Sequence, residues 1–222
     1  MKTPRPSKRT VGTILRKLHK LYPGAECALQ HGDPFQLLIA TILSAQCTDK
    51  RVNMITPELF KQAPNPEKML ALGPKRLERL IQTCGLYQSK AKNIRGACQA
   101  ILQRHGGEVP NSLKELIQLP GVGRKTANVV LANAFGVPAF AVDTHVFRVS
   151  QRLGLARGKT PDQIELQLMD VIPKKDWIDG HHLLIHHGRH LCRARNPLCG
   201  SCPLQKQCRY FSPATLGEFS RK

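Results

Sequence analysis

The sequence lacks an apolar stretch long enough to cross a bilayer. Its most apolar segment, Phe35 to Ala45, is too short for a membrane span and is interrupted by Gln36, Thr41 and Ser44. The basic N-terminus is not followed by the apolar block that a secretion signal requires. We therefore expect a protein with no membrane-spanning segment and no export signal.

Acidic residues are scarce. The 222 residues include 34 Lys and Arg against 15 Asp and Glu, which gives a formal charge of +19. Such an excess favours a polyanionic partner, because each neutralised phosphate releases counterions. A basic protein without such a partner is the simpler interpretation. An anionic membrane surface is a weaker alternative, because no long basic amphipathic helix stands out.

Alternation of apolar and polar residues, the signature of strands, is also missing, and the pattern is helical almost throughout. Capping signals predict helix starts at Asp33-Pro34, at Ser112 and at Thr160. Pro74 predicts a further helix whose apolar face runs to Cys84. We therefore expect an all-α fold with short loops.

Domain boundaries are weakly marked, and no internal repeat or low-complexity segment occurs. Gly136-Val137-Pro138 breaks a helix and is a candidate junction between two domains. The N-terminal helix could pack against either half of the chain.

Eight cysteines without an export signal indicate thiols or metal ligands rather than disulfides. Cys27, Cys47, Cys84 and Cys98 are scattered among apolar neighbours, where cysteine usually serves as a small core residue. The other four crowd together near the C-terminus: Cys192, Cys199, Cys202 and Cys208.

These four cysteines have the spacing Cys-x6-Cys-x2-Cys-x5-Cys. Thiolates that converge from one short loop need a cation or a cluster to hold them together. Structural zinc usually uses two short cysteine hooks, and only one is present here. The spacing alone favours an iron–sulfur cluster over zinc and leaves zinc open.

Pro120-Gly121-Val122-Gly123 separates a predicted helix, Leu113 to Leu119, from a second that opens at Arg124-Lys125, forming a helix–hairpin–helix. Its glycines allow a tight turn and a close approach to another surface, and the N–H groups at the start of the second helix can face a phosphate. Lys125 is a candidate amine nucleophile, because the positive end of the helix dipole and partial burial would both favour a neutral amine. An ordinary phosphate-contacting lysine is the alternative.

Asp143 precedes Thr144 and His145 after an apolar run. Local sequence favours a helix N-cap at this position. A carboxylate near Lys125 could also stabilise an oxocarbenium-like sugar and move a proton from the amine. One residue can do both jobs.

Together these motifs resemble the endonuclease III family, bacterial DNA glycosylases with lyase activity. The likeness is carried by Leu119–Ala127, by Val142–His145 and by the four-cysteine loop, and Ser44–Gln46 and Gly85–Ala91 add to it. The motifs occur in the same order over nearly the whole chain, which makes the match specific.

The resemblance implies two helical domains flanking a DNA-binding groove. One would be a six-helix barrel containing the hairpin, residues 27–137. The other would combine residues 1–26 and 138–222 and carry a [4Fe–4S] cluster on the four cysteines. It further implies a monomeric, cytoplasmic bacterial enzyme, associated with the nucleoid, that acts on double-stranded DNA carrying damaged bases or abasic sites.

The resemblance also implies a mechanism, in which Lys125 attacks C1′ of a nucleotide with an oxidised pyrimidine and expels the base. Asp143 assists, a Schiff base forms, and β-elimination cuts the strand. The target must leave the base stack, so Gln46 would fill the space and Leu86 would wedge the opposite strand, unless Leu86 is an ordinary core residue. We expect the remaining DNA contacts from Gly121, Gly123, Arg124, His145, Arg193 and Arg195.

One departure excludes a neighbouring branch. The mismatch enzymes that remove adenine lack the lysine and use an acid on the helix before Gln46, and Phe35 to Ala45 contains no acid. Two alternatives remain: a non-catalytic hairpin module that only grips DNA, and a monofunctional glycosylase. The segment from His181 to His190 is rich in histidine, and we favour packing over metal binding there.

Overall fold

The computed structural model describes residues 6–211, and every regular element within that range is helical. In the described residues, no helix is both long and apolar enough to span a bilayer. Contacts between Cα atoms divide the chain into two compact units. One consists of residues 27–139; the other combines 6–26 with 140–211.

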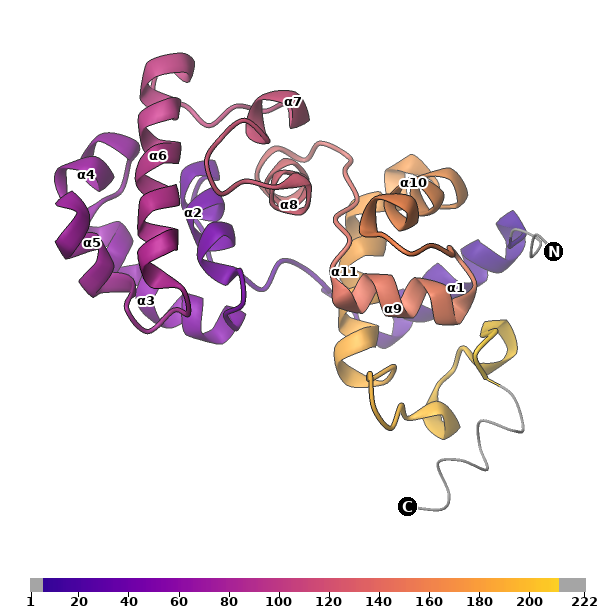
Figure 1. The fold of residues 1–222 in the computed structure, drawn as a ribbon. Helices are drawn as coiled ribbons and strands as arrows, with labels where there is room; N and C mark the ends of the chain where they lie inside the picture. The colour runs from indigo at the N-terminus through magenta and orange to yellow at the C-terminus, as the bar shows by residue number, and fades with distance from the viewer. Residues whose placement is uncertain (1–5, 212–222) are drawn as a thin grey trace. The chain divides into compact units, whose positions relative to one another are not determined.

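The 27–139 unit contains seven helices, shown in Figure 1. In chain order they are α2 (Pro34–Ser44), α3 (Asp49–Gln62), α4 (Pro66–Ala71), α5 (Gly73–Ile81), α6 (Tyr87–His105), α7 (Leu113–Leu116) and α8 (Arg124–Phe135).

Helix α2 forms the centre of this unit. Its residues from Phe35 to Leu43 are buried with the exception of Gln36, and it contacts α3, α6 and α8. Asp33 caps the helix as predicted, accepting a hydrogen bond from the N–H of Gln36 at 2.8 Å, and Pro34 fills the first turn. A helix buried on all sides explains why this segment is nearly continuously apolar.

The predicted helix at Pro74 is shorter than its apolar pattern indicates. Helix α5 ends at Ile81, so Cys84 is buried in the turn that follows and not on the helix face. The N–H of Cys84 bonds to the carbonyl of Ile81 at 2.8 Å, three residues back, which is a turn and not an α-helical contact.

The 6–26 and 140–211 unit is built on α1 (Lys8–Leu21), α9 (Thr144–Leu153), α10 (Pro161–Val171) and α11 (Trp177–His190). Three short 3₁₀ turns complete the unit: η1 (Lys174–Asp176) precedes α11, and η2 (Cys199–Ser201) and η3 (Gln205–Gln207) follow it. Helix α11 contacts both α1 and α9, and α10 contacts α9.

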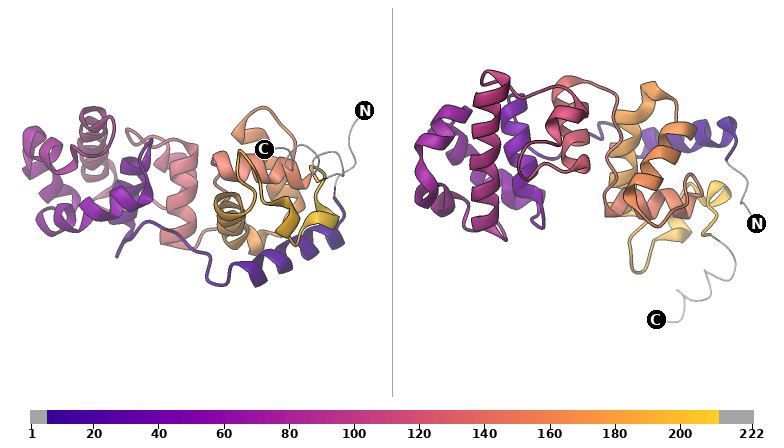
Figure 2. Two further views of the ribbon diagram at one scale, coloured as in Figure 1. Left: turned by 90° about the horizontal axis from the view of Figure 1, so that it is seen from below. Right: turned by 45° about the horizontal axis from the view of Figure 1, so that its top comes forward.

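The N-terminal helix packs with the C-terminal part of the chain, which settles a question that the sequence left open. Val11, Ile14 and Leu18 of α1 belong to the core that α9 and α11 share. Lys17 donates hydrogen bonds to the carbonyl of Pro203 at 2.8 Å and to Gln207 Oε1 at 3.0 Å. Figure 2 shows α1 running along the C-terminal segment.

The histidine-rich helix α11 places its rings among packed side chains. His182 is buried, and burial lowers its pKa to about 3, so the ring is neutral near pH 7. His186 and His190 lie against the ring of Tyr22, with centroids 5.9 and 6.1 Å away.

Helix α3 offers a test of the packing. Leu59 is fully buried and Met54 is 62% exposed on the same helix. We expect Leu59→Ala to lower the free energy of unfolding by about 2–5 kcal/mol, because it leaves a cavity. Met54→Ala should change it by less than about 0.5 kcal/mol. Denaturant titration of both variants checks this, and equal losses would contradict the assigned burial.

Candidate functional site

The hairpin follows the predicted order with a shorter first helix. Helix α7 ends at Leu116, not at Leu119, because the N–H groups of Gln118 and Leu119 bond three residues back instead of four. Ser112 caps α7 and accepts a hydrogen bond from the N–H of Glu115, as the capping signal predicts. Buried Leu119 and Val122 anchor the turn between the helices.

Two glycines bring the turn against helix α6. Gly121 has a φ of +77°, and a Cβ atom built on it would lie 2.7 Å from Cβ of Asn93. One turn further along α6, a Cβ on Gly96 would lie 3.0 Å from Cγ of Pro120. A side chain on Gly121 would clash with Asn93, and one on Gly96 would have to displace the Pro120 ring slightly, so the hairpin packs closely on α6.

The start of α8 is exposed to solvent. Gly123 is its N-cap and supplies no side-chain acceptor to the first turn. Arg124 and Lys125 occupy the first two helical positions, and both side chains are exposed. The partial burial that the sequence analysis allowed for Lys125 is therefore absent.

Asp143 is the N-cap of α9, and its carboxylate accepts a hydrogen bond from the N–H of Val146 at 2.7 Å. The capping interpretation is confirmed. Asp143 belongs to the unit that holds α9, whereas Lys125 belongs to the unit of the hairpin. The side chain is half-buried, which leaves part of the carboxylate accessible beyond its capping role.

Gln46 and Leu86 have the same unusual backbone conformation. Their φ angles are +52° and +58°, in the left-handed region that side chains with a Cβ seldom occupy. Each costs about 1–3 kcal/mol and persists only where surroundings enforce it, often at a functional position. Leu86 is 61% exposed, so the interpretation as an ordinary core leucine is wrong.

The two segments also touch each other. A Cβ built on Gly85 would lie 3.5 Å from the carbonyl oxygen of Gln46. Exposed Gln46 and exposed Leu86 therefore stand on neighbouring turns of one unit, although forty residues separate them in sequence.

His145 is held more tightly than a free DNA contact would be. Its Nδ1 lies 3.2 Å from Nη2 of Arg148, one turn further along α9. A Cβ on Gly188 of α11 would lie 2.9 Å from Cβ of His145, so the two backbones approach closely there. Packing between α9 and α11 thus fixes this half-buried ring.

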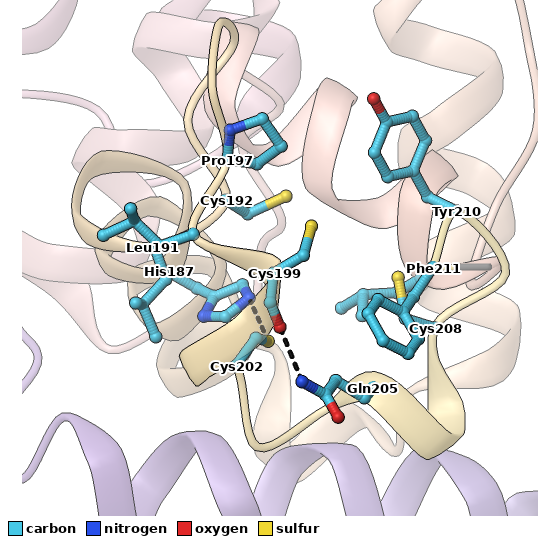
Figure 3. Close-up of a pocket in the computed structure, with 12 residues that line it drawn as sticks. His187, Leu191, Cys192, Pro197, Cys199, Cys202, Gln205, Cys208, Tyr210 and Phe211 are labelled. Carbon is cyan, nitrogen blue, oxygen red and sulfur yellow. Dashed lines mark hydrogen bonds between the residues drawn. The ribbon is translucent and has the colours of Figure 1, made fainter. Parts of the chain in front are cut away.

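The four C-terminal cysteines line one cavity, drawn in Figure 3. The sulfurs of Cys192, Cys199 and Cys208 stand around its space, and Cys202 lies behind the ring of His187. The remaining walls are largely apolar, from Leu153, Leu191, Pro197, Leu198, Tyr210 and Phe211. Four soft thiols around an apolar cavity suit a four-iron cluster, which is larger than a single zinc ion.

The thiols need a positive partner in order to ionise. Burial, and then the other cysteines of the cavity, raise the pKa of Cys199. Burial also leads the rise in the pKa of Cys202 and of Cys208. An iron–sulfur cluster removes this penalty by binding the thiolates directly.

Arg152 on α9 was not predicted from the sequence, yet it holds the cysteine loop. Its guanidinium donates to Sγ of Cys192 at 3.5 Å and to the carbonyls of Arg193 and Ala194 at 2.7 and 3.1 Å. Its own carbonyl accepts from Sγ of Cys208 at 3.3 Å. These hydrogen bonds fix the side of the cysteine loop that faces α9.

Arg193 and Arg195 are exposed on the outer side of the same loop. Arg148, which was also missed, adds a bond from Nε to the carbonyl of Cys192 at 3.1 Å. The only advance signal was the spacing of Arg148 and Arg152, four residues apart on one helical face.

Comparison with known proteins agrees with this arrangement. Residues 39–174 match the model of the HhH-GPD superfamily base excision DNA repair proteins. Residues 192–208, bounded by the first and last of the four cysteines, match the iron–sulfur binding domain of endonuclease III. Endonuclease III of Synechocystis sp. is 52% identical over 202 residues, which is 90% of this chain and 92% of that protein.

Two solved structures are similar over the whole fold. A non-covalent endonuclease III–DNA complex has a TM-score of 0.90 and 46% identity, covering 98% of this chain and 100% of that one. A trapped endonuclease III–DNA covalent intermediate has a TM-score of 0.88 and 48% identity, covering 92% and 97%.

The hairpin glycines should differ in their tolerance of a methyl group. Gly121→Ala introduces both the Asn93 clash and a left-handed alanine, so we expect a loss of about 1–3 kcal/mol in unfolding free energy. Gly123 has an extended backbone with nothing within 4 Å, so Gly123→Ala should fold with nearly wild-type stability. Equal destabilisation of the two would refute the close packing on α6.

Asp143 allows its cap to be tested separately from any chemistry. Asp143→Ala removes the acceptor for the N–H of Val146 and should cost about 1 kcal/mol of stability. Asp143→Asn keeps an oxygen in the same place and should remain close to wild type. Urea unfolding of both variants measures the difference, and an equally large loss in Asp143→Asn would mean that the charge itself stabilises the fold.

Proposed function

Because the chain belongs to the endonuclease III family of base excision DNA repair proteins, we propose that it removes oxidised pyrimidines from DNA through Lys125 and Asp143. The chain is a DNA-binding base excision repair glycosylase and lyase, and it carries a [4Fe–4S] cluster. We propose the roles of Lys125 and Asp143 and the choice of oxidised pyrimidines as substrates. The observation that carries it is an exposed lysine in the first turn of α8, directly after the hairpin.

Lys125 is the proposed nucleophile. Its amine attacks C1′ of the damaged nucleotide, and the bond to the base breaks with its electron pair leaving on the base. The carboxylate of Asp143 stabilises the positive charge that develops on the sugar and accepts a proton from the attacking amine. The ring then opens to a Schiff base between Lys125 and C1′.

Strand cleavage follows from this Schiff base. The cationic imine acidifies the proton on C2′, and loss of that proton expels the 3′ phosphate by β-elimination. Water finally releases Lys125 from the shortened product. A lysine that only contacted phosphate would give neither the covalent intermediate nor the cut.

DNA contacts are proposed on both units. In the hairpin, Gly121 and Gly123 allow a phosphate close to the N–H groups of α8, and Arg124 adds charge. Gln46 and Leu86 are proposed to fill the space of the flipped nucleotide and to wedge the opposite strand, which fits an amide and an exposed apolar side chain.

In the other unit, Cys192, Cys199, Cys202 and Cys208 are the proposed cluster ligands. The cluster supplies a fixed scaffold for their loop when bound, and Arg152 holds the loop's inner backbone. Arg193 and Arg195 are proposed to meet the phosphate backbone from its outer side, with His145 nearby on α9. We further propose that the enzyme works as a monomer on damaged chromosomal DNA in the nucleoid.

Borohydride trapping tests the role of Lys125. Incubation with duplex DNA carrying thymine glycol or an abasic site, followed by borohydride, should give a covalent complex with the wild type. Lys125→Gln should abolish it, whereas Lys61→Gln, at an exposed lysine of α3, should leave it intact. Asp143→Asn should slow base release by about 10²–10⁴-fold.

Three outcomes would contradict the proposal. DNA binding without any trapped complex would favour a non-catalytic hairpin module. Release of thymine glycol without strand cleavage would favour a monofunctional glycosylase. Cleavage of abasic sites with no release of thymine glycol would exclude oxidised pyrimidines as the substrate.

A further inference from the structure

Two cysteines outside the cluster loop lie in direct contact. Sγ of Cys47 is 3.6 Å from Sγ of Cys84, a separation at which two sulfur atoms touch without being bonded. They are thirty-seven positions apart in the sequence, from which we expected two unrelated core residues. Cys84 is buried and Cys47 is half-buried, so one member of the pair is reachable from solvent.

Both cysteines sit on turns whose backbone is fixed. The N–H of Cys47 bonds to the carbonyl of Ser44 at 3.1 Å, and the N–H of Cys84 bonds to Ile81 at 2.8 Å. Gly85 brings the second turn against the backbone of Gln46. A disulfide bond is about 2.05 Å long, so the sulfurs need to approach by about 1.5 Å, a movement within reach of side-chain rotation and small backbone shifts.

We propose that Cys47 and Cys84 form a reversible disulfide when the protein meets hydrogen peroxide or a small-molecule disulfide. We propose further that this bond restrains the turns of Gln46 and Leu86 and weakens DNA binding. The second part rests on the function proposed above, and the first does not.

The chemistry assigns different roles to the two sulfurs. The thiolate of Cys47 attacks one oxygen of peroxide, the O–O bond breaks, and a sulfenic acid and one water result. The Cys84 sulfur then attacks the Cys47 sulfur and displaces the second water. Overall, two thiols and one peroxide give one disulfide and two waters. With a small-molecule disulfide as oxidant, two exchanges release two small thiols instead.

The surroundings support this order. Burial, and then the hydrogen bond and charge of Cys47, raise the pKa of Cys84 to about 11, which suits a second, resolving thiol. The cations Lys90 and Arg51 act in the opposite direction and limit the rise in the pKa of Cys84. Lys90 is itself buried and donates to the carbonyl of Leu43 at 2.8 Å, which keeps its charge beside the pair.

The link would act on Gln46 and Leu86, two of the residues with left-handed backbones. Gln46 precedes Cys47, and Leu86 follows Cys84 by two positions. On this proposal, these side chains move as they fill the vacated space and wedge the opposite strand. A bond that joins their turns resists that movement, so the oxidised protein should bind damaged DNA less tightly.

Peptide mapping tests the bond itself. The full-length protein with its cluster is treated with peroxide or glutathione disulfide, alkylated, digested and weighed. We expect the Cys47 and Cys84 peptides joined, with the mass of two hydrogens missing, and separated again by a thiol reductant. Cys84→Ala should abolish the link, and Cys98→Ala, which removes another buried thiol of the same unit, should leave it intact.

Three results would contradict the proposed disulfide between Cys47 and Cys84. Both thiols could remain open to alkylation, Cys47 could pair with a different cysteine, or the link could form only in protein whose visible cluster absorbance has been lost.

Binding to duplex DNA with an abasic site tests the consequence. The oxidised wild type should bind at least about fivefold more weakly than the reduced protein, and reduction should restore it. Cys84→Ala should bind equally before and after oxidant. Unchanged or tighter binding by fully linked protein would overturn the regulatory part. Failure of the reduced protein to bind at all would instead count against the proposed function.

Discussion

The close contact between the hairpin and helix α6 determines where the proposed nucleophile stands. Gly121 packs on Asn93 with no room for a side chain, and Pro120 packs closely against Gly96. This contact fixes the turn and therefore the direction in which α8 starts. Lys125 lies exposed in the first turn of α8.

The proposed nucleophile and the proposed cluster ligands belong to different units. Lys125 lies in the unit of residues 27–139, and the four cysteines lie in the other unit. Arg152 and Arg148 connect the cysteine loop to α9, the helix that Asp143 caps. A cluster held by these four cysteines would therefore stabilise the unit that contains Asp143, and the proposed bond breaking is by Lys125 and Asp143.

Much of the fold could be predicted because local signals and tertiary structure agree. Capping residues at Asp33, Ser112 and Asp143 begin helices where the sequence indicates. The cysteine spacing alone favoured iron–sulfur over zinc, and the likeness to a family made the assignment specific. The outward position of Leu86 distinguishes it from a core leucine, which its residue type could not do.

What sequence could not provide were contacts between distant segments. The premature end of α5 before Cys84, the bonds of Arg152 to the cysteine loop and the Cys47–Cys84 contact all depend on tertiary packing. The exposure of Lys125 is another example, since the periodicity of α8 does not show how its first turn is covered.

The most direct test of the central claim is to identify the amine that becomes bonded to DNA. The borohydride-reduced complex of the wild type with abasic-site DNA is digested with nuclease and protease, and the modified peptide is sequenced by mass spectrometry. The account predicts a single sugar remnant on Nζ of Lys125. A remnant on another lysine or on the N-terminal amine, with Lys125 unmodified, would contradict it.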